Sequence, residues 1–236
     1  MQKTVALLSV LLCLTFAGST LWVPDFGGFD PEQFPIPQDN PPVQPAGYAF
    51  AIWGVIYLWL IAGMGFGLWR RTLDPAWHAM RAPLCLSLAV GSIWLPVAVL
   101  SPVWAAILIW AMLLPALVAL FRAPYQDGWW ALVPVGLYAG WLSAASCVAL
   151  GLIAAGYGYM GAETAAFTFI FLALVVASAV QSQLQRAPSY GLAVVWALVA
   201  IAVQNMNSAP TVAALAAGGA LSLLFSVWKV WRSNRP

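Results

Sequence analysis

Long apolar runs make up most of the chain, and short segments that contain nearly all the charged residues separate them. A helix needs about twenty consecutive apolar residues to cross a bilayer. Strands of a membrane barrel would instead alternate apolar and polar positions over about ten residues. The pattern therefore predicts an all-α integral membrane protein with eight transmembrane helices, at residues 4–22, 47–69, 82–100, 103–121, 129–157, 164–184, 188–206 and 210–228.

Prolines and small polar residues mark several of the breaks. The segment 82–121 contains no charged residue, and Ser101-Pro102 divides it into two spans. Proline inside a helix removes a hydrogen bond and kinks the axis. Pro96, Pro115 and Pro134 lie inside predicted spans.

The first apolar run has two interpretations. Residues 4–22 follow Lys3 and end in the small residues of 17–20, which fits a cleaved signal peptide as well as a retained first helix. The loop 23–46 that follows contains seven prolines and no Lys or Arg. It is too rich in proline for a helix, so we expect an ordered lid or an extended segment.

The charged residues divide between the two ends of the predicted bundle. With eight spans, all nine basic residues lie on the side of the N-terminus. Because cytoplasmic loops of membrane proteins are enriched in Lys and Arg, both termini are predicted to be cytoplasmic. The basic residues are Lys3, Arg70, Arg71, Arg81, Arg122, Arg186, Lys229, Arg232 and Arg235. The acids expected on the opposite side are Asp25, Asp30, Glu32, Asp39 and Glu163.

Composition excludes several classes of function. Hydrophobic residues make up 63% of the chain and charged residues 7%, whereas a soluble domain carries about 25% charge. A net charge of +2 without a basic cluster gives no support to nucleic-acid binding. Three widely spaced cysteines, Cys13, Cys85 and Cys147, indicate packing residues and no metal site.

No Asp, Glu, Lys, Arg or His lies inside a predicted span, which argues against transport coupled to protons or other ions. His78 is expected in the short cytoplasmic loop after Arg71, as a solvated histidine. The few polar residues do not form a catalytic constellation, so we expect no enzyme.

Aromatic residues provide the candidate chemistry. Phe50, Trp53 and Tyr57 are spaced at i, i+3 and i+7, so they would form one stripe on the second helix. Interfacial anchoring explains Tyr48, but Trp53 and Tyr57 lie one and two turns deeper. The stripe is therefore either packing or the wall of a ligand site.

Two further faces bring an indole together with small or hydroxyl residues. Ser87, Gly91 and Trp94 share a face of the third helix, which would leave a gap beside the indole. Tyr138 and Trp141 share a face of the fifth helix. Either these side chains fill the bundle, or they line a pocket suited to a flat apolar ligand.

The segment 45–57 resembles the second transmembrane helix of the TspO/MBR family, the tryptophan-rich sensory or translocator proteins. The resemblance rests on a proline-rich loop followed by Phe50-x-x-Trp53-x-x-x-Tyr57. It extends to the central Trp94 and to Leu137-Tyr138-Ala139-Gly140-Trp141, which is similar to the family's Pro-Tyr-Leu-x-Trp element.

The resemblance covers residues 4–157, and it favours 4–22 as a retained helix. It implies a five-helix core at 1–160 and three additional helices at 161–236, as in a long bacterial form. The family's third-helix Gln and Asn align here with Ser87 and Gly91, and its fifth-helix Asn with Ala149.

By resemblance, the protein binds a flat hydrophobic ligand, such as a porphyrin, haem intermediate or sterol, with no obligatory cofactor. Expected partners are the lipid bilayer, a hydrophobic small molecule and, as a candidate, a second copy of the chain, in a bacterial cytoplasmic membrane. The pocket residues that it implies are Phe50, Trp53, Tyr57, Trp94, Tyr138 and Trp141.

Three alternatives to a sensory protein stay open. The protein could transport such a ligand without ion coupling, or break down porphyrins as family precedent suggests. It could also be a membrane scaffold whose small-residue faces dock a partner helix. The faces in question contain Gly151, Gly156, Ala213, Ala217 and Ala220, and candidate polar contacts near the outer end are Gln204, Asn205 and Asn207.

Overall fold

The computed structural model describes residues 2–23 and 26–233, and within them every long element is a helix. All eight α-helices are long and apolar enough to cross a membrane, counting the short 3₁₀ turns that extend two of them. The number of spans predicted from the sequence is therefore confirmed. The helices are α1 (Gln2–Gly18), α2 (Ile52–Arg70), α3 (Pro75–Ala98), α4 (Pro102–Arg122), α5 (Leu132–Gly156), α6 (Ala162–Gln183), α7 (Pro188–Asn205) and α8 (Pro210–Ser233).

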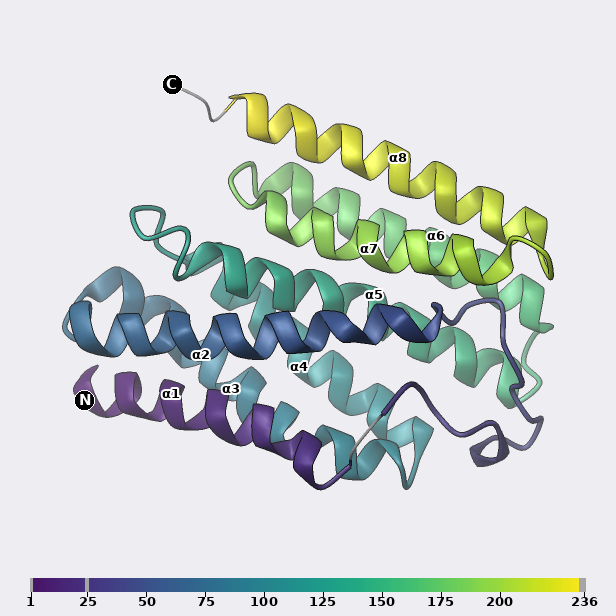
Figure 1. The fold of residues 1–236 in the computed structure, drawn as a ribbon, viewed down its shortest axis with the longest axis horizontal. Helices are drawn as coiled ribbons and strands as arrows, with labels where there is room; N and C mark the ends of the chain where they lie inside the picture. The colour runs from purple at the N-terminus through teal and green to yellow at the C-terminus, as the bar shows by residue number, and fades with distance from the viewer. Residues whose placement is uncertain (1, 24–25, 234–236) are drawn as a thin grey trace.

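Helix α5 lies at the centre of the bundle (Figure 1). It contacts α2, α4, α6 and α7, while α1 and α3 lie beyond α2 and α4, and α8 packs on α6 and α7. Most of its side chains are buried, and many are glycine, alanine or serine. A helix that is apolar all round belongs in a core, and small residues let neighbouring helices approach closely.

Helix α3 begins seven residues earlier than predicted. Asp74 caps it, since its carboxylate accepts hydrogen bonds from the backbone N–H of Ala76 (2.9 Å) and Trp77 (3.3 Å). Pro75 occupies the first helical position, where its fixed φ suits a helix start. His78 and Arg81 therefore lie within a candidate span. The prediction of a loop there, and of spans free of ionisable residues, was wrong.

Two other helix starts also differ from prediction. Residues Gly47–Ala51 form a 3₁₀ turn before α2 begins, and α5 begins at Leu132, so Trp129 and Trp130 lie in the preceding turn. Pro96 and Pro115 lie inside helices as expected. Pro134 does not interrupt a helix, because it falls in the first turn of α5, where no intrahelical hydrogen bond is lost.

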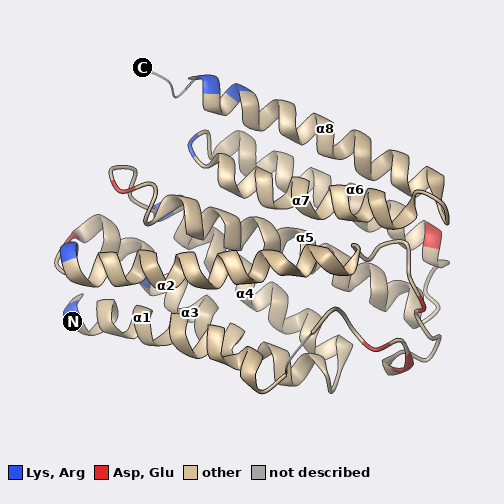
Figure 2. Ribbon diagram, in the orientation of Figure 1, with Lys and Arg blue, Asp and Glu red and all other residues tan. Residues whose placement is uncertain are grey.

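Charged residues gather at the two ends of the bundle (Figure 2). The described Lys and Arg residues lie at the end that holds the N-terminus, and Asp30, Glu32, Asp39 and Glu163 lie at the other end. The predicted separation of charge is thus present in the described part of the chain; Asp25 and Arg235 lie outside it. We call these the basic end and the acidic end.

At the basic end, a cluster of hydrogen-bonded side chains links three segments of the bundle. Asp127, in the loop between α4 and α5, accepts hydrogen bonds from Arg71 Nε (2.7 Å) and from Trp77 Nε1 (2.9 Å). Arg81 is fully buried beside Trp77 and donates to the backbone carbonyl of Arg71 at 3.1 Å. Asp127 therefore links the end of α2, the start of α3 and the loop before α5.

The pKa of Asp127 lies below its usual value, because Arg71 donates a hydrogen bond to the ionised carboxylate and Trp77 adds a second. A lowered folded-state pKa contributes stability above the ordinary carboxyl pKa of about 3.9, and this contribution is lost as the pH falls through the folded-state value. We expect the melting temperature in detergent to fall by a few degrees between pH 7 and pH 3. In the Asp127→Asn variant this fall should be smaller, because the side chain no longer titrates.

Glu32→Gln at the acidic end is the matched control, because Glu32 is exposed and forms no salt bridge with a described residue. It should leave the pH profile unchanged. An Asp127→Asn protein that kept the full acid-dependent loss of stability would contradict the assignment.

The proline-rich loop 23–46, called the lid from here on, is ordered over its described residues. It folds across the acidic end of the bundle, where hydrogen bonds join it to α3, α5 and α7 (Figure 1). The backbone N–H of Ile36 donates to Gly156 at 2.9 Å, and Gln33 Nε2 donates to the carbonyl of Ala98 at 3.1 Å. Asn205 Nδ2 donates to the carbonyl of Pro42 at 2.9 Å.

The lid also fills the small-residue face of α5. Phe34 lies against Gly156 and Val43 against Gly151, at sites where a Cβ would collide with them. This face was predicted to dock a partner helix in a scaffold protein, and that prediction was wrong because the chain covers it with its own loop. Asn205, the last residue of α7, is buried under the lid.

Candidate functional site

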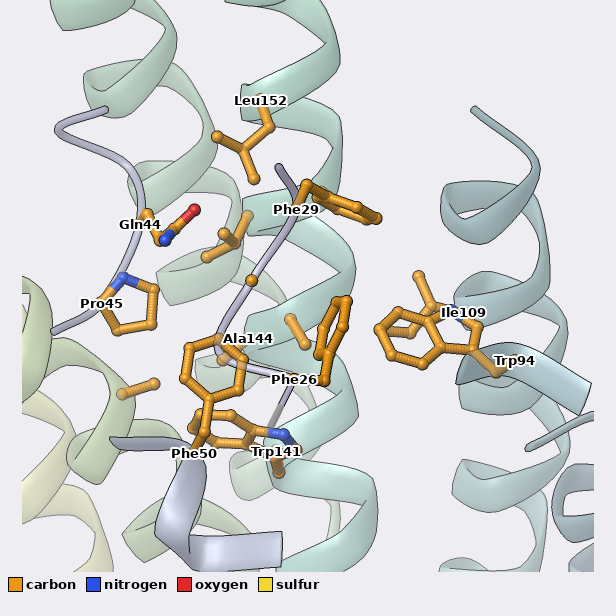
Figure 3. A pocket seen from close by; sticks show the side chains of 15 residues that line it. Phe26, Phe29, Gln44, Pro45, Phe50, Trp94, Ile109, Trp141, Ala144 and Leu152 are labelled. Atoms are coloured by element: carbon orange, nitrogen blue, oxygen red, sulfur yellow. The ribbon is translucent and has the colours of Figure 1, made fainter. Parts of the chain in front are cut away.

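Two adjoining cavities lie under the lid, between α5 and helices α1 to α4. The larger has a volume of about 310 Å³ and the smaller about 60 Å³. Figure 3 shows the smaller cavity, with lid residues on one side and α5 behind. Four residues line both cavities: Phe26, Phe50, Trp94 and Ile109.

Phe26 of the lid forms most of the partition between the cavities. Figure 3 shows its ring between Trp94 on one side and Phe50 and Trp141 on the other. The ring meets Trp94 edge to face at a centroid distance of 5.4 Å and Phe50 at 6.4 Å. Edge-to-face contacts stabilise aromatic pairs beyond their buried area, so these rings help to hold Phe26 in place.

Five of the six predicted residues line the cavities. Trp53 and Tyr57 line the larger cavity, Trp141 lines the smaller, and Phe50 and Trp94 line both. Trp53 and Tyr57 stack at 5.3 Å with planes 17° apart. Phe50 and Trp53 both meet Trp141 edge to face, at 5.9 and 6.2 Å, so the stripe on α2 turns inward to α5.

The sixth residue, Tyr138, does not line either cavity. It is fully buried behind Trp53, with 0% of its surface exposed, and its hydroxyl lies 2.8 Å from Ser87 Oγ. Ser87 in turn donates to the carbonyl of Met112 at 2.7 Å. Tyr138 therefore supports the cavity wall from behind by linking α5 to α3 and α4.

The gap expected beside Gly91 and Trp94 is filled. The ring of Phe16 from α1 occupies it, close enough that a Cβ on Gly91 would collide with the ring. Phe16 also contacts Trp53, Tyr57 and Tyr138 at centroid distances of 5.0 to 5.7 Å. That gap is packing, and the open space lies nearer the lid.

Sequence reasoning missed the residues that the lid and α1 contribute. Phe16, Phe26, Phe29 and Gln44 line the cavities; the last three come from a loop and belong to no periodic face. One signal was present, since phenylalanines at positions 26, 29 and 34 are unusual in an acidic, proline-rich loop. Large apolar side chains in a loop indicate that the loop packs against the rest of the protein.

The cavity walls offer much aromatic surface and few hydrogen-bonding groups. The polar side-chain groups are the hydroxyls of Thr20 and Tyr57, the indole N–H groups of Trp53 and Trp141, and the amide of Gln44. Trp94 Nε1 already donates to the carbonyl of Ala105 at 2.9 Å. Within the described residues no ionisable acid or base other than Tyr57 lines either cavity. This set suits a flat apolar ligand with one or two polar substituents.

A metal site is not apparent in the described part of the chain. It contains no group of three or more His, Cys, Asp or Glu side chains placed to bind an ion. The three cysteines are free and buried. The fully buried Arg81 lies at the basic end, outside the lining of both cavities.

Comparison with known proteins identifies the family. The family model described as TSPO-like protein matches residues 36–228, from the second half of the lid through α8. No curated protein and no solved structure matches the chain. The match covers most of the chain and includes α6, α7 and α8, and all eight helices are apolar enough to span a membrane. The chain is therefore a multi-pass membrane protein that belongs to the TSPO-like family.

Proposed function

We propose that this protein is a membrane-embedded binding or sensory protein for a flat hydrophobic ligand. The observation that carries the proposal is the aromatic cavity pair under the lid, in which the stacked Trp53 and Tyr57 face Trp94 across open space. Flat π-surfaces bind flat ligands by dispersion and stacking, and the hydroxyl of Tyr57 supplies a polar contact that fixes orientation.

The proposed ligand class is a tetrapyrrole, such as a porphyrin or haem intermediate, or a sterol-like molecule. The larger cavity lies at the lower end of the range of about 300–1,000 Å³ typical of small-molecule sites. A tetrapyrrole would extend into the smaller cavity and displace the Phe26 ring. Phe26 belongs to the lid and contacts Phe29, Phe50 and Trp94 through its ring, so we expect this displacement to require no movement of a helix.

Membrane orientation is part of the proposal. We place both termini in the cytoplasm of a bacterium, with the protein in the cytoplasmic membrane and the lid on the opposite side. The gathering of described Lys and Arg residues at one end supports this placement. The cavities would then lie under the lid at the side of the outer leaflet.

Titration of the purified protein with protoporphyrin, followed by tryptophan fluorescence, tests the proposed function. We expect saturable quenching in the micromolar range, weakened about tenfold by Trp53→Phe or Trp141→Phe, because each change removes an indole face from the wall. Trp104→Phe is the matched control, since Trp104 is 62% exposed on α4 and lines neither cavity. Quenching that is linear, or equal in all four proteins, would contradict the site.

Flux measurements separate binding from transport. Among the described residues, the lining of the cavities offers no carboxylate, Lys, Arg or His, so we expect uptake of the ligand into sealed vesicles to be insensitive to a pH gradient. A sensory protein binds the ligand without net flux. Flux that depended on a pH gradient would contradict both functions.

A further inference from the structure

A lengthwise groove runs between α7 and α8 on the outer face of the bundle, where the two helices lie side by side (Figure 1). One part, of about 510 Å³, extends from near the acidic end past the middle, and a second, of about 370 Å³, lies at the basic end. Leu224 lines both parts, so they adjoin along the same pair of helices. Small side chains of α8, among them Ala213 and Ala217, leave this space open between the two helices.

At the basic end, the groove is lined by aromatic rings and lies near two basic side chains. Trp228 and Trp231 form its wall. The Arg232 guanidinium lies 4.5 Å from the ring centre of Trp228, and the Lys229 ammonium lies 4.6 Å from that of Phe225. Neither cation forms a salt bridge with a described carboxylate. The apolar groove thus ends beside two cations held on aromatic rings (Figure 2).

We propose that the groove binds an anionic phospholipid. One acyl chain lies along α7 and α8, and the phosphate of the headgroup is held by Lys229 and Arg232. Apolar side chains alone line the long part, which suits a hydrocarbon chain. Tryptophan is favoured at the level of lipid headgroups, and basic residues there attract anionic lipids. The charge at one end selects an anionic lipid over a zwitterionic one.

A second copy of the chain fits this groove less well. In a two-fold dimer with its axis along the membrane normal, the same surface meets itself and equal ends lie together. Lys229 and Arg232 of one copy would then approach the same pair of the other, and like charges repel. A lipid phosphate instead neutralises the pair.

The test is native mass spectrometry of the full chain released from membranes containing equal amounts of phosphatidylglycerol and phosphatidylcholine. We expect one retained phosphatidylglycerol per chain. Lys229→Gln with Arg232→Gln should weaken its retention roughly tenfold to thirtyfold, since each basic residue near an anionic surface contributes about fivefold. Ala217→Phe, which fills the groove from an exposed position, should also reduce retention.

Arg70→Gln with Arg122→Gln is the matched control, because it removes two exposed cations from the same end of the bundle and neither lines the groove. Its lipid retention should equal that of the unaltered protein. Three outcomes overturn the proposal: equal losses in the two double variants, equal retention of both lipids, or a dimer that Ala217→Phe dissociates. Melting temperatures of all variants show that each is folded.

Discussion

Replacing Gly140 with alanine should lower the free energy of unfolding by about 3 kcal/mol, the upper end of the usual effect of overpacking. Gly140 lies on α5 where α7 crosses, and a Cβ there would overlap the backbone carbonyl oxygen of Tyr190 and crowd Ala193. A backbone atom cannot rotate away as a side chain can. The two helices must separate, and the contact of α7 with the central helix is lost along its length.

Gly65→Ala is the control for this prediction. Gly65 also lies inside a helix, but a Cβ there meets no atom within 4 Å. Alanine stabilises a helix interior by up to about 1 kcal/mol relative to glycine. Thermal unfolding in detergent should therefore shift in opposite directions for the two variants. Shifts of the same sign and size would show that the α5–α7 contact is not as tight as described.

Trp77→Ala is the second change for which we expect a large loss of stability, about 3 to 5 kcal/mol, as for other buried aromatic residues. Trp77 is fully buried at the start of α3, lies against Gly67 of α2 and donates to Asp127. Its removal leaves a cavity, and the carboxylate of Asp127 loses one hydrogen bond. Trp77→Phe keeps most of the volume, so it should lose only about 1.5–3 kcal/mol, the value of a hydrogen bond to a charged group.

Trp69→Ala is the appropriate comparison for Trp77, because Trp69 is at the same end of the bundle and 74% exposed. We expect its effect to stay within about 0.5 kcal/mol, as for most surface substitutions. Steric trapping or chemical unfolding in detergent gives the free energies. A Trp77→Ala protein as stable as Trp69→Ala would disprove the role of Trp77 in joining α2, α3 and the loop before α5.

The number of spans could be predicted because it depends on long apolar runs, and single residues or turns change the mean hydropathy of such a run very little. The start of α3 could not be predicted from the same signal. Residues 75–81 include His78 and Arg81 and look polar, yet Asp74 and Pro75 begin the helix and the bundle buries Arg81. Capping and tertiary burial override average hydropathy there.

The candidate site was partly predictable for a similar reason. Phe50, Trp53 and Tyr57 follow helical spacing, so their common direction could be inferred from the sequence. Helical spacing does not show how deeply a side chain is buried. Tyr138 of α5 lies behind the cavity wall, where its hydroxyl is hydrogen-bonded to Ser87. Phe26 and Phe29 come from a loop without periodicity, and only the folded lid brings them to the cavities.

The attachment of the lid to α7 delays the completion of the lid during synthesis of the protein. Pro42 gains its hydrogen bond only after Asn205 is made, 163 residues later, and Ala49 only after Trp196, 147 residues later. At about 5–20 residues per second, that interval lasts roughly 8 to 30 seconds. During this time the lid can already form its hydrogen bonds to α3 and α5 through Gln33 and Ile36, so its junction with α7 is the last part of the lid to be fixed.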